Sequence, residues 1–360
     1  MGTVVTKLGG TIQPATQRRL VTVLVSALQV RDSCHGGMEG IRWHPSRKPF
    51  THQSLQPAPP QGRTWTGKEC LLRSLSDLAV SGPDLLAATL AAAKDGELGR
   101  QELLAALLKE CRKEKLEYRV VALETTGTIL SQLKLDHFKV KWARLGRLNS
   151  DSNVTQDLYD IVECHLPKPV AESDKENEME VDREEGVRQV ELQYGILTCL
   201  GLAWPEARDT QELYLATMVD HLGALADNTT RRNQLAIAKC IGSLLKAWKL
   251  PQHLAKSEQA CSDIFAKIAK IISTLLLIPK YAQLRTETLQ VLGQAIKLLV
   301  ESKSADLVYL FRDEITRSLD GVIKDLGSDP STKTTARDLK TSLNSIQLGE
   351  GEAKWAEEKH

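Results

Sequence analysis

Apolar residues recur every three or four positions from Lys68 onward, which is the period of amphipathic helices. The first such stripe ends at Ser81-Gly82-Pro83, a sequence that stops a helix. We therefore predict a succession of helices joined by short turns. The early stripes are Leu71, Leu72, Leu75, Leu78 and Ala79, then Leu103, Leu104, Leu107 and Leu108, and, after a break at Glu114–Glu117, a helix from about Tyr118 to Leu133.

Four of the predicted helices share one template when they are aligned on a glycine. Eight positions before the glycine is a long polar residue, four before it an aliphatic one, and three after it a large apolar one. These offsets keep the apolar positions on one side of a helix, and the missing side chain would allow close helix approach. In that order, the sets are Arg119, Leu123, Gly127 and Leu130; Gln193, Leu197, Gly201 and Trp204; Gln234, Ala238, Gly242 and Leu245; and Arg285, Leu289, Gly293 and Ile296.

The spacing of the glycines is that of a helix-pair repeat. They lie 74, 41 and 51 residues apart, and a HEAT or armadillo repeat has about 40–47 residues. The first spacing fits either two repeats or one repeat with an insertion. Amphipathic helices at Leu213–Ala226 and Ile264–Ile278 precede two of the glycine helices. We predict an all-α, HEAT-like solenoid, an α-α superhelix of the armadillo type. An ordinary helical bundle is the alternative, but its helices would share only the 3.6-residue period and not a glycine at a fixed position.

Composition and charge divide the chain into five segments. Residues 1–66 carry eight Lys or Arg and two acids, whereas Ala171–Glu185 carry eight acids and two bases. Neither stretch can bury enough apolar surface to fold alone. We predict a poorly ordered, basic, Pro-rich lead-in at 1–61, helical repeats at 62–170, an acidic loop at 171–187, helical repeats at 188–347 and a polar tail at 348–360.

The composition of the whole chain disfavours several classes of protein. Aromatic residues make up 4% of the 360 residues, too few for a typical β-sandwich, and the net charge of +1 does not suit a general nucleic-acid-coating protein. We expect no signal peptide and, without a run of eighteen apolar residues, no membrane insertion. Seven cysteines without a C-x-x-C pair favour reduced thiols inside the cell.

One motif points to a different class of function. Residues Gly62–Lys68 spell G-x-x-x-x-G-K, the start of a phosphate-binding loop. The next residue is Glu69, where a Ser or Thr should hold Mg²⁺, and the preceding segment is Pro-rich rather than a strand. A nucleotide-binding protein is thus an alternative, and we favour a turn that leads into the first helix.

Metal-binding and catalytic motifs are not recognisable. Cys34-His35 and Cys164-His165 are adjacent pairs with no further ligand at suitable spacing, and His137, His221 and His253 stand singly. We interpret the single histidines as surface or capped core residues. We predict no catalytic residue, no cofactor, no metal site and no small-molecule substrate.

Two charged features are weak candidates for binding a partner. Arg231 and Arg232 precede a helix and could contact an acidic partner, although a solvated helix start is the favoured interpretation. The run Lys109–Lys115 mixes both signs of charge, which suits a solvent-facing helix end. The partner-binding residues therefore stay unknown at this stage.

From Gly62 to about Leu343 the chain resembles the C-terminal end of the large HEAT-repeat proteasome adapter and scaffold family. The most specific features are the Trp-x-Gly-Lys element and Leu-Gly-x-Ala-Trp-Pro at Leu200–Pro205. An acid-rich stretch before that second element is a further similarity, whereas residues 1–61 do not match. The segments that carry the resemblance are GRTWTGKE (62–69), LLKECRKEKLEYRVVAL (107–123), LQYGILTCLGLAWPEARDTQELY (192–214) and YAQLRTETLQVLGQAIKLLVESK (281–303).

The resemblance implies a non-enzymatic adapter that binds the 26S proteasome, links its regulatory and core particles and couples proteasomes to vesicle or motor proteins. It also implies a role in ubiquitin-dependent degradation, including that at the endoplasmic reticulum. The expected location is the cytoplasm and nucleus, with association to the endoplasmic reticulum, endosomes and cytoplasmic vesicles. We expect the chain to be the end of a much longer protein. A helical-repeat adapter for an unrelated cargo is the alternative within the same class.

Overall fold

The structure, a computed structural model, describes two compact units, residues 1–106 and 107–360. In the first unit, α3 (Gly67–Ser81) contacts α4 (Pro83–Ala91), and the predicted stop separates them because Pro83 opens the second helix. Helix α5 (Arg100–Glu110) begins in this unit and ends in the other. The described residues are 67–91, 99–113, 115–133, 139–141, 151–153, 166, 183–206 and 211–346, with 16, 19, 22 and 23. The rest of the predicted lead-in and the tail at 348–360 lie outside them.

The second unit is a succession of helices, and most of the later ones begin at a side-chain cap. Thr230, Ser257, Ser304 and Asp329 each accept a hydrogen bond from a backbone N–H three residues on, in the first turn of α10, α12, α14 and α15. The bounds in chain order are α6 (Leu116–Gln132), β1 (Lys139–Lys141), β2 (Asp151–Asn153), α8 (Arg183–Ala203), η5 (Trp204–Glu206), α9 (Gln211–Ala226), α10 (Arg231–Ala247), α11 (Leu250–Leu254), α12 (Glu258–Leu277), α13 (Ala282–Ser302), α14 (Ala305–Lys324) and α15 (Pro330–Asn344).

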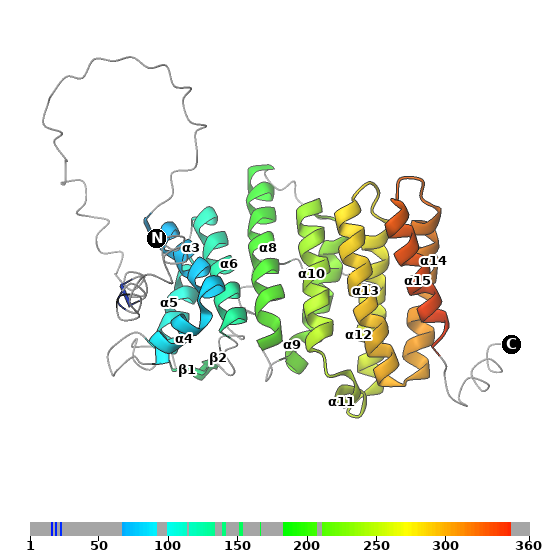
Figure 1. The fold of residues 1–360 in the computed structure, drawn as a ribbon, viewed down its shortest axis with the longest axis horizontal. Helices are drawn as coiled ribbons and strands as arrows, with labels where there is room; N and C mark the ends of the chain where they lie inside the picture. Colours follow the sequence, from blue (N-terminus) through cyan, green and yellow to red (C-terminus); the bar gives the residue numbers. More distant parts are fainter. Residues whose placement is uncertain are drawn as a thin grey trace, which may run out of the picture. The chain divides into compact units, whose positions relative to one another are not determined.

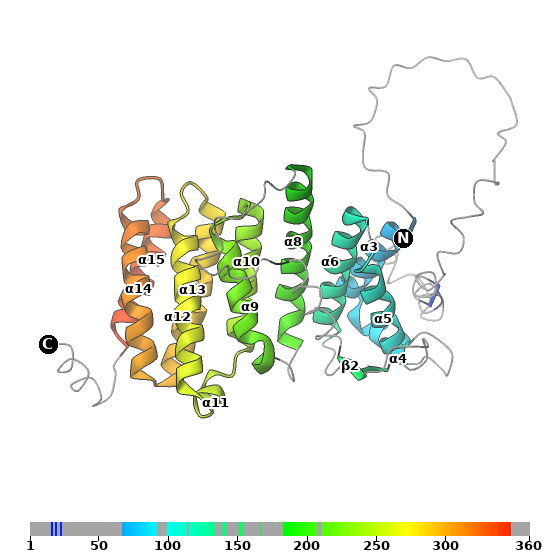
Figure 2. The same cartoon turned by 180° about the vertical axis from the view of Figure 1, so that it is seen from behind.

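These helices form two layers. One layer, which we call the glycine layer, places α6, α8, α10, α13 and α15 side by side in chain order (Figure 1). The other contains α9, α12 and α14, also in chain order, and is seen in front in Figure 2. Consecutive helices of each layer contact one another. The prediction of an all-α, armadillo-type helical-repeat solenoid is therefore confirmed.

The glycine register has the structural meaning that the sequence predicts. A Cβ atom added to Gly127 would lie 2.8 Å from the Cα of Cys199, and one added to Gly201 would lie 3.3 Å from the Sγ of Cys240. At Gly242 the nearest atom is Cγ2 of Val291, at 3.2 Å. Each glycine thus lies against the residue two positions before the next glycine. The missing side chain lets neighbouring helices of the glycine layer approach closely.

The contact loosens toward the last described helix. A Cβ atom on Gly293 would meet the Cδ2 of Leu339 at 3.7 Å, an ordinary van der Waals distance. Two residues after Leu339, where a fifth register glycine would stand, α15 has the exposed residue Thr341. Four residues before it and three after it are the exposed residues Arg337 and Asn344 instead of apolar ones. Helix α15 therefore has polar, exposed residues at the register positions that are apolar in the other helices.

In α6 and α10, the long polar residue eight positions before the glycine caps the preceding helix. Arg119 Nε donates to the carbonyl of Cys111 at 3.1 Å, and Gln234 Nε2 donates to that of Ala226 at 3.2 Å. These carbonyls lie at helix C-termini, where no intrahelical donor is available. Arg285 departs from this pattern.

The 74-residue spacing corresponds to one repeat with an insertion, because α8 packs directly on α6. Part of the insertion is a short antiparallel pair, β1 with β2, in which Lys139 pairs with Asn153. The predicted acidic loop extends to residue 187, but α8 already begins at Arg183. The remaining segment boundaries stay predictions.

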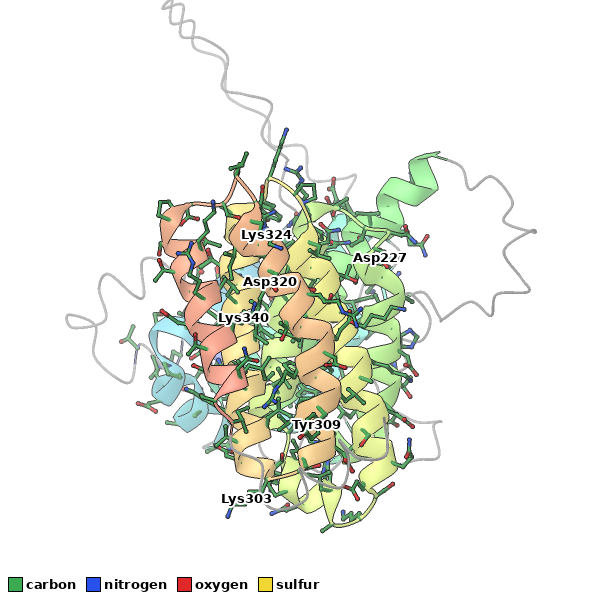
Figure 3. All side chains as sticks on the ribbon, turned by 90° about the vertical axis from the view of Figure 1, so that its right-hand side faces the viewer. Asp227, Lys303, Tyr309, Asp320, Lys324 and Lys340 are labelled. Atoms are coloured by element: carbon green, nitrogen blue, oxygen red, sulfur yellow. The ribbon has the colours of Figure 1, made fainter. Side chains whose placement is uncertain are left out.

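Buried Arg285 joins α13 to the loop that follows α14. Its Nη1 pairs with Asp325 and donates to the Oγ of Ser328 at 2.6 Å. A second ion pair joins Lys340 of α15 to Asp320 of α14, with 2.6 Å between Nζ and Oδ1. Both residues are labelled in Figure 3. Both side chains of this second pair are partly exposed, so solvent screens it and it adds little to stability.

The glycine contacts predict opposite effects for two equivalent substitutions. In the full chain, Gly127→Ala should lower the free energy of unfolding by about 1–3 kcal/mol, because the new Cβ meets backbone that cannot move alone. Gly293→Ala should leave it unchanged or raise it by up to about 1 kcal/mol, because alanine is the better helix former. Urea unfolding measures both. Equal effects of the two substitutions would contradict the register.

Asp325, in the loop after α14, should make the stability of the fold depend on pH. The Gly327 N–H and Arg285 lower the pKa of Asp325 below its usual value. A carboxyl with a lowered pKa stabilises the fold above its unfolded pKa of about 3.9, and this contribution is lost as the pH falls through the folded value. The difference in Tm between the wild type and Asp325→Asn should thus be largest near neutral pH and shrink below about pH 4. A difference that stays constant to about pH 2 would refute this.

Candidate protein-binding surface

A groove of about 260 Å³ lies between α8 and α10 at the surface of the glycine layer. The two helices stand next to each other in Figures 1 and 2. Small and aliphatic side chains make up most of its lining, among them Leu197, Gly201 and Leu202 from α8 and Leu235, Ala236 and Ser243 from α10. Such a surface offers apolar contact area to another molecule.

The close approach at Gly201 shapes the floor of this groove. Cys240 packs against that glycine, and its thiol donates a 2.8 Å hydrogen bond to the carbonyl of Leu197 on the neighbouring helix. Small residues at Gly201, Ala236 and Ser243 then leave the space above the contact open. The same glycine register therefore joins the two helices and creates the groove.

Arg232 is held at one end of the groove. Its Nη1 lies 3.0 Å from Oε2 of Glu191, and its guanidinium carbon lies 3.4 Å from the centroid of the Tyr194 ring. Both charged side chains are about half exposed, so the ion pair adds about 0–1 kcal/mol. These two contacts hold the Arg232 guanidinium in one position.

Lys239 lines the groove two helical turns after Arg232, about 10.5 Å farther along the axis. It is exposed, and no described carboxylate lies within ion-pair distance of it. Leu202, opposite on α8, keeps 37% of its surface exposed. The groove thus combines exposed apolar surface with cationic groups along one side.

The end of the Gly62–Lys68 motif lies in a helix, and the turn predicted before it stays a prediction. Gly67 and Lys68 are the first two residues of α3, and residues 62–66 lie outside the described part. Glu69, at the position where a phosphate-binding loop has a Mg²⁺-binding hydroxyl, is 3% exposed. A buried acid at this position does not favour nucleotide binding.

The two described histidines are core or capped residues, as predicted. His221 is buried in α9, and Nδ1 of His253 accepts a 2.6 Å hydrogen bond from the indole N–H of Trp248. His137, Cys34-His35 and Cys164-His165 fall outside the described residues. Within the described ranges, no group of three or more His, Cys, Asp or Glu side chains is placed to bind a metal ion.

No helix in the described part of the chain is long and apolar enough to cross a membrane.

The two charged candidates from the sequence have different outcomes. Arg231 and Arg232 are exposed at the start of α10, and Arg232 belongs to the groove. The prediction of a solvent-facing helix end at Lys109–Lys115 is partly wrong, because Glu110 and Cys111 are buried. Glu110 accepts a 2.5 Å hydrogen bond from the hydroxyl of Tyr118, which accounts for a carboxylate in this place.

Comparison with known proteins identifies the family. A sequence profile described as "ECM29, C-terminal ARM-like repeats" matches residues 145–343, more than half of the chain. The chain belongs to this ECM29 family. Its matched part includes α8, α10 and the groove between them.

Two curated relatives agree with this assignment. The human "Proteasome adapter and scaffold protein ECM29" is 28% identical over an alignment of 291 residues, which covers 79% of this chain and 14% of the relative. The Drosophila melanogaster "Proteasome-associated protein ECM29 homolog" is 22% identical over an alignment of 323 residues, which covers 79% of this chain and 15% of the relative. The chain thus spans about a seventh of the length of these ECM29 proteins.

Three buried cysteines of this ECM29-family chain are core residues and poor nucleophiles. Cys111, Cys199 and Cys240 are buried in the second unit, and burial raises the pKa of Cys111 and of Cys240 to about 12. Burial also raises the pKa of Cys199, and the neighbouring thiols add to this. A thiol with a raised pKa has little thiolate and reacts slowly.

Thiol labelling tests this burial. In a chain with Cys34→Ser and Cys164→Ser, exposed Cys70 should react with a thiol reagent at least about a hundredfold faster than the buried cysteines, because they lack both access and thiolate. Mass spectrometry of digested, partly labelled protein assigns each rate. The same labelling in urea is the control, since all thiols should then react. Rapid labelling of Cys199 in the folded chain would contradict the packing.

Proposed function

We propose that this chain is a non-enzymatic scaffold module that binds the 26S proteasome. The observation that carries the proposal is the match of residues 145–343 to ECM29 repeats, on a helical-repeat unit with an exposed groove. Two relatives whose names describe a proteasome adapter and a proteasome-associated protein support it. Repeat proteins of this type bind partners along extended surfaces, which suits an adapter.

The finer parts of the proposal concern what the scaffold joins. It links the regulatory and core particles, and it couples proteasomes to vesicle or motor proteins at the endoplasmic reticulum, endosomes and cytoplasmic vesicles, from a pool in the cytoplasm and nucleus. The naming of a relative as an adapter, a protein that joins others, supports a linking role. Degradation of ubiquitin-tagged proteins is then the process it serves.

An adapter for an unrelated cargo is the second candidate. The observation in its favour is that the groove and the two-layer array are features that helical-repeat proteins share whatever their cargo. Recovery of bound partners from cells separates the two candidates.

Affinity purification of the tagged full chain from cells should enrich subunits of both the regulatory and the core particle above a tag-only control. Quantitative mass spectrometry measures the enrichment. Gly127→Ala is a useful comparison, because a loosened glycine layer should recover fewer proteasome subunits at equal bait amount. Enrichment of a different complex, with proteasome subunits at the control level, would overturn the proposal in favour of the second candidate.

A further inference from the structure

The groove between α8 and α10 differs from the equivalent positions at the neighbouring helix contacts. One position after the register glycine, the described glycine layer has polar residues at Thr128, Ser243 and Gln294, but α8 has Leu202. This leucine is 37% exposed and lines the groove. The other helices have polar residues at this position, so the fold does not require an exposed apolar side chain there. Exposed apolar surface of this kind is typical of a binding site.

The distribution of positive charge also distinguishes the groove between α8 and α10 from the other helix contacts. Three positions before the glycine, α6, α8 and α13 have Glu124, Thr198 and Gln290, whereas α10 has Lys239. At the position ten residues before the glycine, α6 and α8 have Glu117 and Glu191, α10 has Arg232, and α13 has Gln283. Only α10 among these four helices has a cation at both positions. It contains no Asp or Glu at all, and Lys246 continues the exposed basic row seven residues beyond Lys239.

The neighbouring contact between α10 and α13 lacks these features. There Gln294 lies over the glycine, with its Oε1 3.5 Å from the position of a Cβ on Gly242. Glu287 takes the place that Ala236 has in the groove. A longer amide and an acid thus replace the small residues that leave the space open between α8 and α10.

The walls of the groove restrict the form of an occupant. Both walls are helices, whose backbone N–H and C=O groups are bonded within each helix. An extended peptide would find no backbone partners here, whereas a helix brings its own hydrogen bonds. The cations Arg232, Lys239 and Lys246 follow one another at seven-residue intervals, about 10.5 Å apart. Carboxylates seven residues apart on an occupant helix have the same spacing.

We propose that this groove binds an acidic amphipathic helix of a partner protein. An aliphatic side chain of that helix packs against Leu202 and Leu235, and carboxylates on the flanking turns pair with Lys239 and its basic neighbours. Arg232, already fixed by Glu191 and Tyr194, orients one end of the ligand. This inference deepens the proposed function, on which it rests, by naming the chemistry of the segment that the scaffold binds.

A labelled synthetic helix tests the proposal without proteasomes. The probe is an Ala-rich peptide of about 18 residues with two Glu seven residues apart and Leu between them on the same face. Fluorescence anisotropy with the full chain should show saturable binding that weakens as salt rises. Lys239→Glu should weaken it about tenfold or more, because attraction becomes repulsion. Leu202→Gln, which installs the amide found at the equivalent position of α13, should weaken it severalfold.

Matched variants make each outcome decisive. Lys297→Glu reverses an exposed charge on α13 and should leave binding within about twofold of the wild type. A peptide with Gln in place of both Glu should bind at least about tenfold more weakly. Equal losses from Lys239→Glu and Lys297→Glu would overturn the site, as would self-association of the chain that Lys239→Glu abolishes, since a second copy would then fill the groove. If the peptide fails to bind while proteasomes still co-purify, the groove proposal falls and the proposed function stands.

Discussion

Close contact at the register glycines of the glycine layer is the constraint on which the other packing depends: at its tightest point an added methyl group is enough to force two helices apart. At Gly127 it would meet the backbone of Cys199, and at Gly201 and Gly242 it would press on side chains of the next helix. This repeated close contact fixes the rotation of α6, α8, α10 and α13 about their axes. That rotation decides which residues are buried between helices, which cap the preceding helix and which face solvent.

The candidate binding surface follows from this constraint. Because the register places the same positions at the surface of each helix, differences among those positions become differences between successive grooves. Small residues and one exposed leucine open the groove between α8 and α10, and Lys239 makes its side cationic. The polar, exposed register positions of α15 indicate that not every helix of the layer is specialised for contact.

Much of the fold could be predicted because its signals are local. The glycine template with its −4 and +3 apolar positions is read from one helix at a time, and so are the stop at Pro83 and the amphipathic stripes. The role of Gln234 could not be predicted, since it depends on where the end of α9 lies in space. The burial of Glu110 depends on Tyr118 for the same reason. Leu202 and Lys239 were missed as site residues, although comparison of register positions in the sequence would have marked both as exceptions.

Hydrogen–deuterium exchange of the full chain, with and without purified 26S proteasome, tests most directly whether the glycine layer is the binding surface. Binding in the groove should stabilise its walls, so amides of α8 and α10 should exchange more slowly in the complex. Amides of α12 and α14, in the other layer, should exchange as in the free chain. Slower exchange confined to α12 and α14 would contradict the account, and so would an unchanged pattern at concentrations where the proteasome is bound.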